Sequence, residues 1–84
     1  MTSIRTLLVD DNCEFLTSCK RFLSKFPEIE VVGYANSGYE ALQQLNLLKP
    51  DLVLLDIIMP KMNGLEATRR IKSQSKSTRV VILT

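Results

Sequence analysis

The sequence predicts an α/β domain built on a parallel β-sheet, because short apolar runs alternate with helical stripes along the chain. Four apolar runs indicate strands, and the three segments between them have apolar residues at helical spacing. The connections are short, which favours right-handed crossovers between parallel strands. The 84 residues are expected to form one domain, 1–84, with strands at 4–9, 30–35, 52–55 and 79–84.

The first helix is predicted from a stripe of apolar residues that ends before Pro27, since proline cannot continue a helix. The stripe consists of Phe15, Leu16, Cys19, Phe22, Leu23 and Phe26. Cys19 is therefore expected to be a buried structural thiol. The chain has two cysteines and no histidine, so we expect neither a zinc site nor a disulfide.

The two other helices have recognisable N-termini. Ser37 followed by Glu40 forms a capping box, in which the serine caps the helix and the glutamate is its third residue. Asn63 followed by Glu66 indicates the start of the last helix, which is marked by Leu65, Thr68 and Ile71. The third strand, at 52–55, has no polar alternation, which is typical of a strand covered on both faces.

The composition is that of an ordinary globular domain, with 45% hydrophobic and 24% charged residues. No apolar run approaches the roughly 18 residues that span a bilayer. The N-terminus lacks the apolar core of a signal peptide. We therefore expect a cytoplasmic protein that does not enter a membrane.

Charge is unevenly distributed along the chain. Residues 1–60 carry five bases and eight acids, a net charge of −3, whereas residues 61–84 carry six bases and one acid, a net charge of +5. The basic cluster consists of Arg69, Arg70, Lys72, Lys76 and Arg79. It is either a contact for an acidic partner or nucleic acid, or a solvated helix end. The absence of interleaved aromatic residues favours the helix end.

Three aspartates directly follow apolar strands. Asp10 and Asp11 come after the first strand, and Asp56 comes after the third. Open α/β sheets bind ligands at the carboxyl ends of their strands. Where such a sheet runs in the order 2-1-3-4, the first and third strands are neighbours and the order reverses between them. A crevice at that point would hold all three carboxylates.

Carboxylates crowded in this way repel one another. Two unit charges 4 Å apart cost about 4 kcal/mol at an effective dielectric constant near 20. A bound cation removes this cost, and hard oxygen ligands without histidine or cysteine suit Mg²⁺. Such a site could draw in a phosphoryl donor for in-line attack by one carboxylate. The simpler alternative is that Asp10 and Asp11 cap the first helix and Asp56 begins a turn, but a doubled acid facing a third favours the metal site.

The sequence resembles the receiver domains of two-component response regulators in three motifs that occur in order. These are LVDDN at 8–12, LLDIIMPKMNGL at 54–65 and VVILT at 80–84. The segments FPEIEVVG at 26–33 and GLEATRR at 64–70 look most like receivers joined to LuxR/NarL-type DNA-binding domains. The resemblance implies a flavodoxin-like parallel sheet in the order 2-1-3-4.

The resemblance also implies roles for individual residues. Asp56 would be the phosphoacceptor. Its phosphoryl group would come from a histidine kinase or a small phosphodonor. Asp11 would bind Mg²⁺ directly and Asp10 would act near it through water. Asp56 and the backbone carbonyl of Ile58 would complete the protein's share of the metal site. Thr84 would be the switch hydroxyl, although a threonine at a strand end is also an ordinary structural residue.

The family has a fifth strand, a conserved lysine in it and two further helices that have no counterpart in these 84 residues. The resemblance therefore implies a receiver domain that is incomplete at its C-terminal end. The fourth strand would then be an exposed apolar edge, which invites pairing with a second chain as a homodimer or a domain swap.

Three functions were weighed against one another. The leading hypothesis is a phosphoacceptor that is itself modified rather than an ordinary enzyme, and that regulates transcription through an output domain outside this chain. Nucleic acid would be contacted only by that output domain. The second is a non-switching receiver that acts as an interaction or dimerisation module. The third, an aspartyl-nucleophile hydrolase of the haloacid dehalogenase type, is disfavoured because Ile58 stands where that family has a second acid.

Overall fold

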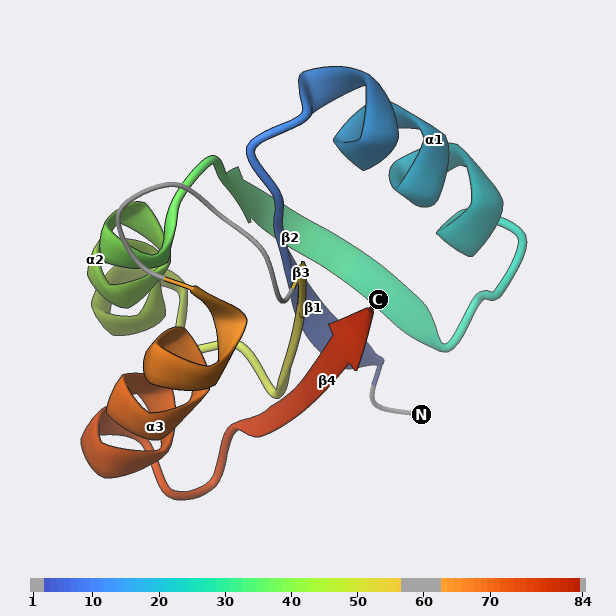
Figure 1. The fold of residues 1–84 in the computed structure, drawn as a ribbon. Coiled ribbons are helices and arrows are strands. Elements are labelled where there is room, and N and C mark those ends of the chain that lie inside the picture. Colours follow the sequence, from blue (N-terminus) through green and yellow to red (C-terminus); the bar gives the residue numbers. More distant parts are fainter. Residues whose placement is uncertain (1–2, 57–62, 84) are drawn as a thin grey trace.

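The computed structural model describes residues 3–56 and 63–83, in which four strands alternate with three helices (Figure 1). The strands are β1 (Ile4–Val9), β2 (Ile29–Ala35), β3 (Leu52–Asp56) and β4 (Arg79–Leu83), and the helices are α1 (Cys13–Leu23), α2 (Gly38–Leu48) and α3 (Gly64–Gln74). The strands form one sheet in the order β2-β1-β3-β4, and each neighbouring pair is parallel. The predicted α/β class and the order 2-1-3-4 are confirmed.

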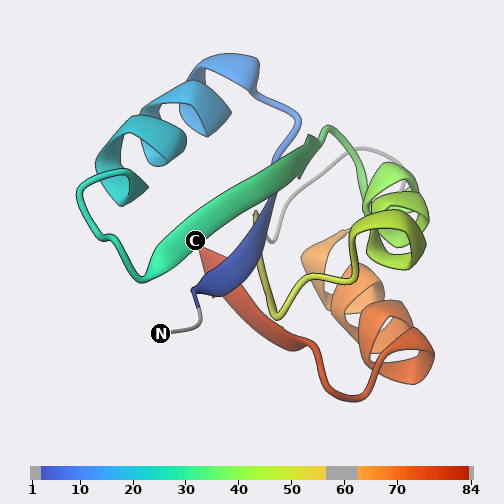
Figure 2. The ribbon, with the colours of Figure 1, turned by 180° about the vertical axis from the view of Figure 1, so that it is seen from behind.

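The helices lie on both sides of the sheet, with α2 and α3 on one side and α1 on the other (Figures 1 and 2). The side with two helices holds the main core, which is formed by Leu7, Val9, Ala35, Ala41, Leu45, Val53, Leu55, Ala67 and Ile71. Val53 and Leu55 of β3 are 0% exposed there. Leu52 and Leu54, on the alternate positions of β3, are only half-buried. Strand β3 is therefore covered completely on the side of α2 and α3 and partly on the side of α1, so the expected cover on both faces is confirmed in part.

Helix α1 is shorter than predicted. It ends at Leu23, and Phe26 lies in the turns that follow, where its N–H donates to the Leu23 carbonyl at 3.0 Å. Phe15 and Phe22 are 43% and 58% exposed. Within the apolar stripe, Leu16 is buried while Cys19 and Leu23 are only half-buried, so the prediction of one continuous buried face is wrong.

The predicted starts of α2 and α3 are confirmed. The Ser37 hydroxyl accepts the N–H of Glu40 at 3.1 Å, and the Asn63 side chain accepts the N–H of Glu66 at 2.9 Å. Of the residues that mark α3 in the sequence, Ile71 is completely buried, as is Ala67, whereas Leu65 is 61% exposed. None of the helices in the described residues is long and apolar enough to cross a membrane.

Candidate functional site

The register of β1 and β3 brings the predicted acidic residues to one edge of the sheet. Val9 is the partner of Leu55 in this parallel pair. Asp10 and Asp56 each follow one of these partners, so they occupy equivalent positions at the carboxyl ends of adjacent strands. The N–H of Asp10 donates to the carbonyl of Ala35 at 3.0 Å, which joins the ends of β1 and β2 at the same edge.

Asp10 is set into the protein at this edge. Asp10 is only 5% exposed, and its Oδ1 accepts the backbone N–H of Asn12 at 2.9 Å. Asp11, the next residue, is exposed. Within residues 3–56 and 63–83, Asp11 makes no ion pair with a lysine or arginine. One acid is therefore held in the wall of the site and the other faces solvent.

Helix α1 is capped by Asn12 and not by either aspartate. The Asn12 side-chain oxygen accepts the N–H of Phe15 at 3.1 Å. The alternative that Asp10 and Asp11 are present to cap this helix is therefore wrong. The predicted site did not include Asn12, although an asparagine directly before a helix is a known capping signal.

Cys19 lies on α1 and responds electrostatically to the site. Burial is the main cause of its raised thiol pKa, and the negative charge of Asp10 raises it further. A raised pKa keeps the thiol protonated and weakly nucleophilic. Cys19 is a free thiol but is half-buried, so the expectation of a buried structural cysteine is only partly correct.

The remaining predicted site residues fall outside the part of the chain that the structure describes. These are Ile58, Thr84 and the side chain of Asp56. Among the described side chains, no group of three acidic, histidine or cysteine residues could hold a metal ion. The predicted group includes the Asp56 carboxylate, so the magnesium ligands and the switch hydroxyl stay predictions.

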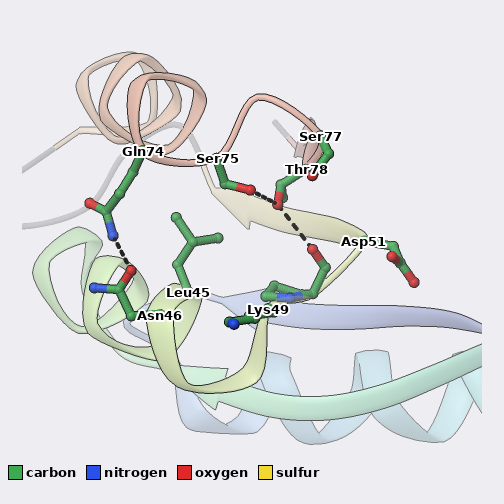
Figure 3. Close-up of a pocket in the computed structure, with 9 residues that line it drawn as sticks. Leu45, Asn46, Lys49, Asp51, Gln74, Ser75, Ser77 and Thr78 are labelled. Atoms are coloured by element: carbon green, nitrogen blue, oxygen red, sulfur yellow. Dashed lines mark hydrogen bonds between the residues drawn. The ribbon is translucent and has the colours of Figure 1, made fainter.

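A polar cavity of about 240 Å³ lies at the opposite edge of the sheet, where α2 and α3 end (Figure 3). Gln74 donates to the Asn46 side chain at 3.0 Å. Thr78 contacts Ser75 at 2.7 Å and donates to the Pro50 carbonyl at 3.0 Å. These polar groups bond to one another across segments far apart in the sequence, so the cavity is part of the scaffold and has no counterpart in the sequence motifs.

The basic cluster is largely engaged in local contacts. Arg69 and Arg70 both pair with Glu66 at 2.8 Å, and Lys72 donates to the carbonyls of Lys76 and Thr78. The hydrogen bond from Arg70 is the main reason that the pKa of Glu66 is lowered, and the charge of Arg69 contributes. This arrangement supports the interpretation of a solvated helix end over a nucleic-acid contact.

Comparison with known proteins adds independent support. Residues 6–84 match the response regulator receiver domain family. The chain is 43% identical over 81 residues to the response regulator GacA of Pseudomonas viridiflava, covering 96% of this chain and 38% of GacA. It is 42% identical over 76 residues to the nitrate/nitrite response regulator NarL of Escherichia coli K12, covering 90% of this chain and 35% of NarL.

An enzyme also appears among the relatives. The chain is 46% identical over 71 residues to a protein-glutamate methylesterase/protein-glutamine glutaminase of Geobacillus kaustophilus, covering 84% of this chain and 20% of the enzyme. The 84 residues thus span only 20–38% of the length of these three curated relatives.

Solved structures agree with the fold. The receiver domain of the regulator NarL from Mycobacterium tuberculosis is 33% identical, with a TM-score of 0.90 over 98% of this chain and 66% of that one. The matched chain in a CheX–CheY complex with BeF₃⁻ and Mg²⁺ from Borrelia burgdorferi is 26% identical. The TM-score is 0.85 over 96% of this chain and 61% of the matched chain. Receiver domains in general bind Mg²⁺ for phosphorylation and interact with histidine kinases. The chain therefore belongs to the receiver domains of two-component response regulators.

Proposed function

We propose that this receiver accepts a phosphoryl group on Asp56, with Mg²⁺ held by Asp10, Asp11, Asp56 and the carbonyl of Ile58. One observation carries the proposal: the parallel pairing of Val9 with Leu55 sets Asp10 and Asp56 level at adjacent strand ends. Adjacent strands lie about 4.8 Å apart. Carboxylates at such a spacing repel, and a divalent cation offsets that repulsion.

The donor set suits magnesium. All the proposed ligand atoms are oxygens, which are hard ligands that Mg²⁺ prefers over nitrogen or sulfur. Asp10 is buried and Asp11 is exposed, so the site has one wall in the protein and one side open to water. That arrangement fits an ion that retains several waters and contacts only a few carboxylates. When bound, Mg²⁺ supplies positive charge for the phosphoryl oxygens.

The transfer itself needs a nucleophile and a leaving group in line. A carboxylate oxygen of Asp56 attacks the phosphorus atom and forms the new P–O bond. The bond from phosphorus to the donor breaks, and its electron pair leaves on the histidine nitrogen of a kinase or on the oxygen of an acyl phosphate. We propose that the Thr84 hydroxyl then donates a hydrogen bond to a phosphoryl oxygen, which couples phosphorylation to a shift at the end of β4.

The direct test is phosphorylation of the chain by acetyl phosphate with Mg²⁺, followed by intact-mass measurement. We expect one added phosphoryl group, which is lost in Asp56→Asn and when the metal is removed with a chelator. Asp51→Asn is the matched control, because Asp51 is an aspartate at the opposite edge of the sheet, where its carboxylate accepts the Arg5 N–H. An unmodified wild-type chain, or equal modification of wild type and Asp56→Asn, would refute the assignment.

The longer protein implied by these relatives is proposed to regulate transcription through an output domain, with a histidine kinase as phosphodonor. The response regulators GacA and NarL, which this chain matches over 38% and 35% of their lengths, support this proposal. In this proposal the receiver is a substrate of phosphorylation and catalyses at most its own modification. The cytoplasmic location and the homodimer or domain swap through β4 stay predictions.

A further inference from the structure

We propose that Asn12 is a positioning residue for the metal site, because its capping of α1 fixes the carboxylate of Asp10. The inference rests on the proposed function, in which Asp10 and Asp11 face the ion. Asn12 itself is exposed and is not proposed as a ligand. Its role is to connect the first turn of a helix to the acid that ends β1.

Three hydrogen bonds place Asn12 at this junction. Its backbone N–H donates to Oδ1 of Asp10 at 2.9 Å. Its side-chain oxygen accepts the N–H of Phe15 at 3.1 Å, and its backbone carbonyl accepts the N–H of Leu16 at 3.1 Å. Its φ of −100° and ψ of 107° are extended, as in capping residues generally. One residue therefore bonds backward to Asp10 and forward to α1.

The backward bond restrains the Asp10 side chain. The backbone of Asp10 is already fixed, because its N–H donates to the Ala35 carbonyl at 3.0 Å. The bond from Asn12 then selects one orientation of the carboxylate above that fixed backbone. A carboxylate that is already oriented loses less conformational entropy when an ion binds.

The bonds from Asn12 to the first turn of α1 hold its backbone N–H in the direction of the Asp10 carboxylate. When the side-chain cap is removed, the first turn of a helix loses a partner for one of its unsatisfied N–H groups and frays. Fraying would release the backbone of residue 12, and with it the direction of the N–H that reaches Asp10. Asp11 lies between the anchored Asp10 and the capped helix start, so its backbone is held by the same contacts although its side chain is exposed.

Helix α2 offers a matched control. It has 11 residues, like α1, and its cap is a bond of the same length, 3.1 Å, from the N–H of Glu40 to the Ser37 hydroxyl. The turn before α2 follows β2, the edge strand of the sheet, and carries no aspartate. Loss of this cap weakens a helix of equal length without touching the bond to Asp10.

The experiment compares Mg²⁺ binding by calorimetry in the wild-type chain and in Asn12→Ala, Asn12→Ser and Ser37→Ala. We expect Asn12→Ala to bind Mg²⁺ about tenfold more weakly, the lower end of the effect of removing an outer partner of a metal ligand. Asn12→Ser is expected to bind within about twofold of wild type, because serine also caps helices well. Ser37→Ala is expected to lower the urea midpoint of unfolding as Asn12→Ala does, with unchanged Mg²⁺ affinity.

A second readout needs no metal. Protection of the residue 12 amide against hydrogen exchange, measured with Mg²⁺ removed, is expected to fall in Asn12→Ala and to persist in Asn12→Ser and Ser37→Ala. Equal loss of Mg²⁺ affinity in Asn12→Ala and Ser37→Ala would show a general stability effect and overturn the proposal. Wild-type affinity in Asn12→Ala would overturn it while leaving the proposed function intact.

The result for the wild-type chain separates the two proposals. A wild type that binds no Mg²⁺ would overturn the magnesium site of the proposed function, and the role of Asn12 with it. A wild type that binds Mg²⁺ and is phosphorylated on Asp56, with no effect of Asn12→Ala, would overturn only the role of Asn12.

Discussion

Aspartates have different surroundings at the two ends of the parallel strands, which are the amino edge of the sheet, where the strands begin, and the carboxyl edge, where they end. At the amino edge, Oδ2 of Asp51 accepts the N–H of Arg5 at 3.0 Å. The backbone of Asp51 bonds both neighbouring strands, since its N–H donates to the Arg5 carbonyl and its carbonyl accepts the N–H of Arg79. At the carboxyl edge, Asp10 and Asp11 stand side by side in the sequence and level with the end of β3. A carboxylate whose neighbours are N–H groups stabilises the fold, whereas acids crowded together favour a cation.

The remainder of the amino edge follows the same logic. Around the cavity in Figure 3, the side chains of Gln74, Ser75 and Thr78 bond to one another, to Asn46 or to backbone carbonyls. Among the described residues, every buried side-chain nitrogen or oxygen has a hydrogen-bond partner. The amino edge is thus expected to contribute stability, and the carboxyl edge to contribute metal binding. Variants at the two edges should separate these properties.

The largest effect is expected for Thr78→Val at the amino edge. Thr78 is 1% exposed, and its hydroxyl contacts both Ser75 and the Pro50 carbonyl. Valine has a similar shape but leaves these partners unsatisfied, which should lower the free energy of unfolding by about 1–3 kcal/mol. Urea denaturation measures the loss, and calorimetry should find the Mg²⁺ affinity unchanged. A large change in affinity with little loss of stability would reverse the proposed division between the edges.

Asp11→Asn, at the carboxyl edge, should weaken Mg²⁺ binding and leave the stability of the metal-free protein almost unchanged. Because Asp11 is exposed, the metal-free stability should change by no more than about 0.5 kcal/mol. In the wild type, Mg²⁺ at ten times its dissociation constant should raise the free energy of unfolding by about 1.4 kcal/mol. This gain should be absent in Asp11→Asn and present in Asp51→Asn. Equal stabilisation of wild type and Asp11→Asn by Mg²⁺ would show that the ion binds elsewhere.

Lys49→Gly should stabilise the amino edge. Lys49 ends α2 with φ 48° and ψ 58°, a left-handed conformation that costs a residue with a Cβ atom about 1 kcal/mol. Glycine removes this cost and keeps the Lys49 carbonyl that accepts from the Arg5 side chain. We expect a gain of up to about 1 kcal/mol in urea denaturation. Lys49→Ala is the control for loss of the charge, and an equal gain there would contradict the backbone explanation.

The smallest effect on stability is expected for a change of Glu66, an acid in the first turn of α3 that forms ion pairs with Arg69 and Arg70. Its carboxyl pKa is lower in the folded state than in the unfolded state, mainly through the hydrogen bond with Arg70 and then the charge of Arg69. The stabilisation is therefore complete above the unfolded-state pKa and is lost as the pH falls through the folded-state pKa.

The side chains of Glu66, Arg69 and Arg70 are 35%, 79% and 51% exposed, so solvent and salt should keep this contribution small. Urea denaturation of wild type and Glu66→Gln across pH should give curves that differ slightly at neutral pH and converge in acid. A difference that grows in acid would mean that the ion pairs do not stabilise the folded state.

Local signals predicted the elements well and their limits less well. The capping residues Ser37 and Asn63 define helix starts through bonds to residues three positions away, so the sequence alone contains both partners. The end of α1 and the burial of Leu65 on α3 were mispredicted, because the apolar side chains of Phe26 and Leu65 are 41% and 61% exposed. Burial depends on neighbours from distant parts of the chain, which helical periodicity does not specify.

The sequence by itself determined the alternation of elements, the starts of α2 and α3, and the placement of acids at the carboxyl ends of β1 and β3. It places Asp10 after an apolar run and Asp51 before one, but it does not show which donors and charges surround either carboxylate. Only the tertiary structure decided this, by bringing the Arg5 N–H to Asp51 from 46 residues away and by pairing β1 with β3. A carboxylate's role depends on which donors and charges surround it in space, and those are set by strand order and register.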